Sequence, residues 1–324
     1  MKRSLLPALI VIWITASPFY SAAAERLRAC YPAIAGNIAP IWIAKEKAFF
    51  AKQGLEVDLT YIRGGTTATA AMLSGEVSFC MIAGAAVIQS QLSGSDLVMV
   101  AGITNTFDFT VFGAKGITSV EDLRGKKAGI NRFGSSSDFA MRYLLERNGL
   151  KPGHDVAVLQ VGGTIERVAA LETGSVQATL VNPPMTLVAR KKGFTELADL
   201  GKLGIEYQHV GLVASERYLR DNRDQARRFI RAFMEAIRFY RNQKDATLQT
   251  VKKYLIVQEA ELLEETYEKY LDLIPKKPYP TLKGIEFILK EIGRNDPRAR
   301  RAYPKNFVDA SFVKELDESG FFDR

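Results

Sequence analysis

The sequence has few of the residues that build covalently cross-linked or metal-stabilised proteins. Its 324 residues include two cysteines, two histidines and two tryptophans. This count leaves little room for a disulfide framework or for a metal site with several protein ligands. Together with the overall composition, it excludes a collagen, a disulfide scaffold, a zinc-ribbon protein and a polytopic membrane protein.

The charge is basic but diffuse. Lysine and arginine number 44 against 36 aspartates and glutamates, which gives a formal charge of +8. No recognisable nucleic-acid motif accompanies this surplus, so we expect no nucleic-acid partner; acidic ligands or a membrane surface are slightly favoured. The chain is 47% hydrophobic and 25% charged, as in globular proteins, and is long enough for two domains of about 100–200 residues each.

The first 24 residues have the three parts of a secretory signal peptide. Lys2 and Arg3 form a positive start, Leu5–Thr15 a short apolar core, and Ala22–Ala24 a small-residue cleavage site. We expect a mature periplasmic protein that begins at Glu25. An uncleaved anchor is the first alternative, which two prolines disfavour. A lipoprotein is the second, which an arginine two residues before the first cysteine disfavours.

Short apolar runs alternate with helical patterns from about residue 27 to residue 213. This alternation predicts an α/β protein with parallel-rich sheets flanked by helices. Gly64-Gly65-Thr66 recurs 98 residues later as Gly162-Gly163-Thr164 in the same structural context, which predicts two similar lobes. After residue 213 the pattern predicts helices alone. Expected strands are 27–33, 56–62, 77–83, 97–103, 127–131, 156–161 and 178–181; expected helices are 39–53, 67–73, 85–92, 136–148, 165–171, 185–192, 222–242, 248–255, 259–273, 282–292 and 308–318.

No catalytic signature stands out in the chain. It lacks the dinucleotide glycine motif, the P-loop, the zinc-protease motif and the nucleophile elbow. His154 lies in an expected turn and His209 enters an expected strand, each without a nucleophile or paired carboxylate nearby in sequence. We expect both histidines to be structural, and we expect neither a metal nor a cofactor.

The two cysteines fall in strands that we expect to lie side by side. Cys30 belongs to the first strand and Cys80 to the third. Export would allow them to oxidise, but cysteine pairs in the middle of a sheet rarely meet disulfide geometry. We therefore expect two buried free thiols.

Loops rich in small residues follow the expected strands of both lobes. Ligands of open α/β sheets bind at the carboxyl ends of the strands, where these loops gather. Hydroxyls and unpaired N–H groups at helix starts suit a small anion or a polar zwitterion, although N-capping alone explains any single loop. The loops are Ala35–Asn37, Gly64–Thr67, Ala83–Ala85, Phe133–Asp138, Gly162–Thr164 and Asn182–Pro184.

Two segments resemble the nitrate/sulfonate/taurine-type solute-binding proteins of ABC importers, which are part of the thiamine-pyrimidine-binding-like superfamily. Residues 39–57 read APIWIAKEKAFFAKQGLEV, and residues 119–127 read SVEDLRGKK. The resemblance covers the mature chain to about Tyr240 and the helical C-terminus only loosely. These motifs identify the family but not the solute.

The resemblance implies a two-lobed periplasmic-binding-protein (type II) fold that closes over its ligand. Lobe 1 would hold residues 25–112 and 213–324 and lobe 2 residues 113–212, with hinge strands near 112–114 and 210–212. The implied function is capture of a small polar or anionic solute, such as a sulfonate, taurine or nitrate, for the permease and ATPase of an importer. We expect a monomer without enzymatic activity. Implied ligand contacts are Gly36, Asn37, Thr66, Gly84, Ala85, Ser135, Ser136, Ser137 and Asn182.

Several side chains and functions stay open at this stage. A thiamine-type pyrimidine is the alternative ligand, and a sensor that reports to a membrane receptor would have the same sequence features. An enzyme resembling the eukaryotic pyrimidine synthases would need a cysteine-rich iron motif, which is missing here. Candidate aromatic walls are Tyr31, Trp42, Phe109 and Phe133, and candidate anion-binding arginines are Arg63, Arg132 and Arg167.

The expected helix start at Ser135–Ser137 makes a direct prediction. Replacing Ser136 with aspartate (Ser136→Asp) would place a negative charge where an anionic ligand would sit. We expect this variant to lose binding of such a ligand, as measured by calorimetric titration. An unchanged affinity would show that the loop is not the anion site.

Overall fold

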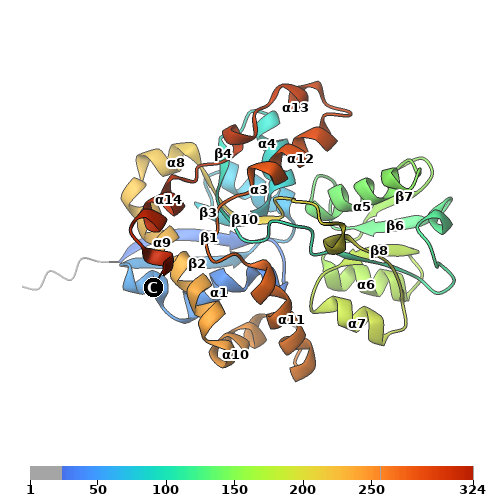
Figure 1. Cartoon of the computed structure of the whole chain (residues 1–324), viewed down its shortest axis with the longest axis horizontal. Helices are drawn as coiled ribbons and strands as arrows, with labels where there is room; N and C mark the ends of the chain where they lie inside the picture. Colours follow the sequence, from blue (N-terminus) through green and yellow to red (C-terminus); the bar gives the residue numbers. More distant parts are fainter. Residues whose placement is uncertain (1–23, 256, 324) are drawn as a thin grey trace, which may run out of the picture.

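The computed structural model describes residues 24–255 and 257–323, and these form two lobes side by side (Figure 1). Each lobe contains one five-stranded sheet with helices packed against it. The expected signal peptide lies almost wholly outside the described residues. Within them, no helix is both long enough and apolar enough to cross a membrane.

The sheet of lobe 1 has the strand order β2-β1-β3-β10-β4. Its first three strands are parallel, whereas β10 runs antiparallel to both β3 and β4. The strands are β1 (Glu25–Tyr31), β2 (Leu55–Tyr61), β3 (Phe79–Ala83), β4 (Leu97–Gly102) and β10 (Val210–Ser215); the helices between them are η1 (Gly36–Ile38), α1 (Ala39–Glu46), α2 (Phe49–Lys52), α3 (Gly65–Leu73) and α4 (Gly84–Leu92).

The sheet of lobe 2 repeats this arrangement in the order β7-β6-β8-β5-β9. Three parallel strands are again followed by an antiparallel one, here β5. The strands are β5 (Thr110–Gly113), β6 (Lys127–Ile130), β7 (Ala157–Gln160), β8 (Ala178–Val181) and β9 (Thr195–Asp199); the helices are η2 (Glu121–Leu123), α5 (Ser136–Arg147), α6 (Thr164–Glu172), α7 (Met185–Lys191) and η3 (Leu200–Leu203).

Two segments carry the chain between the lobes. The outward segment lies between β4 and β5, at residues 103–109, and the return segment lies between η3 and β10, at residues 204–209. A bridge between Thr106 and Glu206 joins them. The resemblance implied hinge strands near 112–114 and 210–212, which lie at the end of β5 and the start of β10, close to these two segments. β5 and β10 are antiparallel to their neighbours in the sheets. The β-α-β alternation in the sequence, which indicates parallel strands, therefore does not show which sheet each of them joins.

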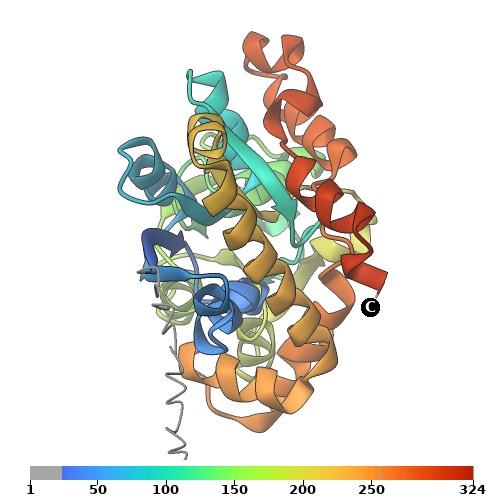
Figure 2. The same ribbon diagram turned by 90° about the vertical axis from the view of Figure 1, so that its left-hand side faces the viewer.

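The C-terminal part is helical, as expected, and packs mainly on lobe 1. Its longest helix, α9 (Arg223–Asn242), lies across one face of the lobe 1 sheet (Figure 2). The other helices are α8 (Glu216–Asp221), α10 (Lys244–Tyr254), α11 (Ala260–Leu273), α12 (Leu282–Ile292), α13 (Pro297–Arg301), η4 (Pro304–Phe307), α14 (Ser311–Glu318) and η5 (Phe321–Asp323).

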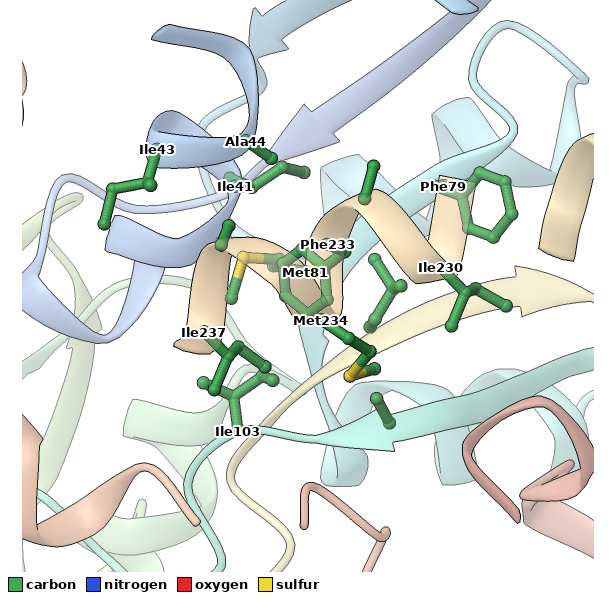
Figure 3. Packing of buried hydrophobic residues seen from close by; sticks show 14 of the residues in the cluster. Ile41, Ile43, Ala44, Phe79, Met81, Ile103, Ile230, Phe233, Met234 and Ile237 are labelled. Atoms are coloured by element: carbon green, nitrogen blue, oxygen red, sulfur yellow. The ribbon is translucent and has the colours of Figure 1, made fainter. Parts of the chain in front are cut away.

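The apolar face of α9 forms the centre of the largest hydrophobic core (Figure 3). Its residues Ile230, Phe233 and Ile237 recur at helical spacing and are buried, because this periodicity places them on one face. Phe229 of the same helix stacks on Phe79 of β3 with ring centroids 4.0 Å apart. Truncating a buried phenylalanine to alanine typically lowers the free energy of unfolding by about 3–5 kcal/mol. The apolar face of α9 therefore holds the helix firmly on the sheet.

The expected helix over residues 39–53 is two helices. Ala48 has a φ of 56°, in the left-handed region that non-glycine residues rarely adopt, and it separates α1 from α2. Phe50 of α2 stacks on Phe229 of α9 with ring centroids 4.6 Å apart. The sequence has no proline or glycine at this point that would indicate the break.

Cys30 and Cys80 form a disulfide, so the expectation of two free thiols is wrong. The strands β1 and β3 pair in register at these two residues, and their Cα atoms are 4.5 Å apart. This separation lies within the range that a disulfide spans. Adjacency of the strands was predictable, whereas the register that places both side chains opposite each other was not.

Removing this disulfide should destabilise the mature protein. A bond across 50 residues of chain restricts the unfolded state, and such bonds contribute about 2–4 kcal/mol. We expect the double variant Cys30→Ala, Cys80→Ala to lose that much free energy of unfolding in urea titrations. Dithiothreitol should lower the stability of the wild type toward that of the variant and leave the variant unchanged; equal sensitivity of both proteins would contradict the prediction.

Candidate functional site

A cavity of about 300 Å³ lies between the lobes, at the carboxyl ends of strands from both sheets. This volume falls at the lower end of small-molecule sites. Both lobes and both connecting segments contribute to its wall. Its lobe 1 side includes Ile34, Asn37, Tyr61 and Met81, its lobe 2 side includes Ser135–Ser137, Thr164, Arg167 and Asn182, and the connecting segments add Phe109 and His209.

The start of α5 forms one edge of the cavity. The hydroxyl of Ser135 accepts a hydrogen bond from the Asp138 N–H at 3.4 Å and donates to the Arg132 carbonyl at 2.7 Å. The hydroxyl of Ser137 accepts from the Asn131 N–H at 2.9 Å. Ser135 and Ser137 therefore hold the loop in place, while the half-buried Ser136 is also part of the cavity wall.

Arg167 is the buried cation of the site. It lies on the inward face of α6 and is 3% exposed. Its Nη2 donates to the Thr164 hydroxyl at 3.0 Å, but Nε and Nη1 have no hydrogen-bond partner among the described residues. Burial lowers the pKa of Arg167 to about 10, against a small opposing effect of neighbouring Glu166. The guanidinium thus remains charged at neutral pH.

A second arginine lies at the mouth of the cavity and is paired. Arg63 of lobe 1 forms an ion pair with Glu166 of lobe 2, with Nη1 and Oε1 2.5 Å apart. Arg190 on α7 and Glu265 on α11 form another link between lobe 2 and the C-terminal helices, at 3.5 Å. The two lobes are therefore in contact around the cavity. Exposed pairs of this kind contribute about 0–1 kcal/mol each.

Beneath the cavity, a buried carboxylate joins four parts of the chain. Asp108 lies in the outward connecting segment, and His209 in the return segment places its Nδ1 3.0 Å from Asp108 Oδ1. Asn37 of η1 and Tyr270 of α11 each donate a hydrogen bond to Oδ2 at 2.8 Å. We call Asp108, His209, Asn37 and Tyr270 the Asp108 cluster.

The partners of Asp108 determine its charge. Burial by itself would raise the pKa of this carboxyl, because a charged group is poorly solvated inside a protein. The nearby His209 and the hydrogen bonds from Tyr270 and Asn37 outweigh burial and hold the pKa below its ordinary value. Asp108 is therefore an ionised acceptor, and its neighbours must direct their donors toward it.

The close packing of α11 against residue 36 requires a glycine at that position. A Cβ atom at Gly36 would lie 2.4 Å from Thr266 and 2.5 Å from the ring of Tyr270, both on α11. The Gly36 N–H also reaches the Pro183 carbonyl of lobe 2 at 3.5 Å. The glycine thus allows α11 to approach η1 closely.

The structure places the sequence-predicted residues in different surroundings. Asn37, Ser135, Ser136, Ser137 and Asn182 lie in the cavity wall, whereas Gly36, Thr66, Gly84 and Ala85 are not part of it.

The residues outside the wall have identifiable neighbours. The Gly84 N–H donates to the carbonyls of Gln208 and His209, at 3.1 and 3.0 Å, so the start of α4 faces the return segment. Ala85 belongs to an apolar cluster with residues of lobe 2. Thr66 lies beside Gly134 of the opposite lobe.

The candidate aromatic residues and arginines divide in the same way. Phe109, Arg63 and Arg167 line the cavity. Trp42 is core and stacks on Tyr254 with centroids 4.7 Å apart, and Tyr31 packs beside it; Phe133 and Arg132 are exposed.

Sequence reasoning missed the Asp108 cluster and did not single out Arg167 from the other arginines. Both have a signal in the sequence. Asp108 stands between Phe107 and Phe109 in an otherwise buried stretch, and Arg167 lies four residues before the buried Leu171 on the same helical face. A charged residue in an apolar context marks either a buried pair or a functional site.

Solved structures of periplasmic binding proteins have this fold. A protein of Bordetella bronchiseptica RB50 is 20% identical with a TM-score of 0.82, over 91% of this chain and 98% of its own. The alkanesulfonate-binding protein SsuA from Xanthomonas axonopodis pv. citri is 19% identical with a TM-score of 0.70 (90% and 99%). The periplasmic nitrate-binding protein NrtA from Synechocystis PCC 6803 is 15% identical with a TM-score of 0.72 (91% and 89%). The chain thus has the periplasmic-binding-protein fold.

Sequence comparison assigns the family. The model of the family described as NMT1/THI5 like matches residues 35–247, so the chain belongs to this family. YtlA of Bacillus subtilis, named a binding protein, is 23% identical over 258 residues, or 78% of this chain and 77% of its own. The riboflavin-binding protein RibY of Chloroflexus aurantiacus is 27% identical over 211 residues, or 62% and 58%. These findings confirm the resemblance stated from the sequence.

The ionised state of Asp108 predicts a pH-dependent stability. A carboxyl whose pKa is lowered by folding contributes stability above its unfolded pKa of about 3.9, and this contribution is lost as the pH falls through the lower folded value. Asp108→Asn should lower the free energy of unfolding at pH 7 by about 3–5 kcal/mol, because it leaves buried partners unpaired.

Urea titrations between pH 7 and pH 3 check this prediction. The difference between wild type and Asp108→Asn should be constant down to about pH 4 and shrink below it. Asp58→Asn, at an exposed position of β2, is the matched control and should change stability by less than about 0.5 kcal/mol. A difference that does not depend on pH would refute the role of the charge.

Proposed function

We propose that this protein is the periplasmic solute-binding component of an ABC importer. It captures a small polar or anionic organic solute between its lobes and delivers it to the permease and ATPase subunits. It acts as a monomer, without cofactor and without catalysis. The cavity enclosed by both lobes is the observation that carries this proposal.

The connection between the lobes supports a mechanism by closure. Two short segments join the lobes, at residues 103–109 and 204–209, and we propose the lobe boundaries there. Rotation about these segments would open the cavity to solvent. A ligand that contacts both lobes gains its full set of contacts only in the closed state, so it shifts the population toward that state.

The wall of the cavity supports a small acid as the solute. It combines apolar side chains such as Ile34 and Met81 with the start of α5 and the buried Arg167. A helix start and a guanidinium both favour an oxyanion. Among the similar proteins, SsuA and NrtA are named as binding alkanesulfonates and nitrate, and RibY as binding riboflavin, so a heteroaromatic ligand is the second candidate.

A thermal-shift screen of residues 25–324 tests this function. The panel contains nitrate, bicarbonate, taurine, alkanesulfonates, aromatic carboxylates, riboflavin and thiamine-type pyrimidines. A ligand at 100 times its dissociation constant adds about 2.7 kcal/mol of stability, which gives a clear rise in Tm. The protein is first unfolded and refolded to remove any ligand that co-purifies with it.

Small-angle scattering separates binding by closure from binding elsewhere. A compound that raises the Tm should also reduce the radius of gyration, because the lobes close over it. A compound that raises the Tm without reducing the radius of gyration would bind outside the cleft. If no compound raises the Tm of the refolded protein, the proposed function fails for these solute classes.

A further inference from the structure

We infer that the solute is an organic acid that also carries a hydrogen-bond donor, with the acid bound by Arg167 of lobe 2 and the donor by the amide oxygen of Asn37 in lobe 1. This inference rests on the proposed function and specifies the chemical class of the solute. It follows from two buried polar groups in which atoms have no hydrogen-bond partner among the described residues.

Arg167 requires an anion. The side chain is 3% exposed and lies in the cavity wall, and both Nε and Nη1 have no acceptor within the described part of the chain. Glu166 directly precedes Arg167 in the chain, but its carboxylate pairs with Arg63 at the cavity mouth. Burying an unpaired guanidinium is costly, and a carboxylate or sulfonate offers several oxygens to its free donors.

Asn37 requires a donor. Its Nδ2 donates to Asp108 Oδ2 at 2.8 Å, and an ionised carboxylate can only accept, so the orientation of the amide is fixed. Asn37 is part of the cavity wall, and its remaining amide oxygen, Oδ1, is buried and has no partner in the described structure. A hydroxyl, amine or ring N–H of the solute would satisfy it.

The two groups belong to opposite lobes. Arg167 is on α6 of lobe 2, and Asn37 is in η1 of lobe 1. Closure without a solute buries both groups unpaired, which penalises the closed state. A solute with both an acid and a donor removes both penalties at once, whereas an acid alone removes only the penalty in lobe 2.

Apolar side chains line the cavity beside these two groups. Ile34, Ile38, Met81, Phe109 and Val210 all contribute to the wall. These side chains favour a carbon body and make a bare inorganic anion a poor fit, since an inorganic ion would leave apolar surface unfilled.

Matched compound sets test the chemical class without any change to the protein. One set is 3-aminopropanesulfonate, propanesulfonate and propylamine; a second is 4-hydroxybenzoate, benzoate and phenol. The same three-way comparison is made with a heteroaromatic acid. In the set that fits the cavity, we expect the compound with both groups to raise the Tm most and to bind about tenfold or more tightly than the acid without the donor.

Arginine variants test the acid end. Arg167→Met should weaken binding of the best acid about tenfold or more, while Arg167→Lys, which keeps the charge but loses the planar fork, should retain part of the affinity. Arg124→Met is the matched control: it removes a paired, exposed arginine of lobe 2 that is not part of the cavity wall, and it should change affinity less than about fivefold.

The ligand-free stability distinguishes a binding role of Arg167 from a structural one. A structural arginine would lower the Tm when replaced, whereas removal of an unpaired buried charge should leave the Tm of ligand-free Arg167→Met unchanged or raise it. A lowered ligand-free Tm together with unchanged acid binding would overturn the assignment.

The remaining outcomes separate this inference from the proposed function. If a neutral or cationic compound is the tightest ligand, or if acids with and without a donor bind equally, the inference is wrong and the solute-binding function stands. If no acid raises the Tm, the inference is also wrong. If no compound of the matched sets or of the wider panel raises the Tm, the result counts against the proposed function as well.

Discussion

The buried carboxylate of Asp108 is the constraint on which the geometry of the cleft depends. A buried ionised group must have its partners supplied by the protein, and those of Asp108, itself in the outward connecting segment, come from the return segment, η1 and the C-terminal helix α11. Satisfying one charge therefore fixes the relative positions of four segments that are far apart in the sequence. The same requirement orients Asn37 and leaves its oxygen free in the cavity wall.

The apolar cores and the cavity wall differ in how well their groups are paired and packed. The cores of the lobes are closely packed and apolar, with aromatic stacks such as Phe79 on Phe229, and a disulfide joins β1 to β3. The cavity wall instead contains side chains with polar atoms that no described residue pairs, most clearly Nε and Nη1 of Arg167. Such groups lower the stability of the empty closed form, and proteins accept this cost where a ligand restores the missing contacts.

Most of the fold was accessible from the sequence, and five of the nine implied contacts lie in the cavity wall, where their role in binding stays a prediction. Helical and strand periodicity located most elements, including α12 and β8 with their exact bounds, because local patterns report the buried face directly. The implied contacts Gly84 and Ala85 occupy a strand end like the others, yet α4 faces the return segment there. Which strand ends face the cavity depends on the arrangement of the lobes, which no local pattern records.

The sequence by itself determined the two-lobed α/β class, the helical C-terminal extension and the edge of each sheet where the cavity lies. These features follow from residue periodicity and from the direction of parallel strands. Only the tertiary structure decided that Cys30 meets Cys80, where the chain crosses between lobes, and that Arg167 rather than Arg132 is buried in the cavity wall. Each of these depends on strand register or on contacts between distant segments, and long-range packing sets both.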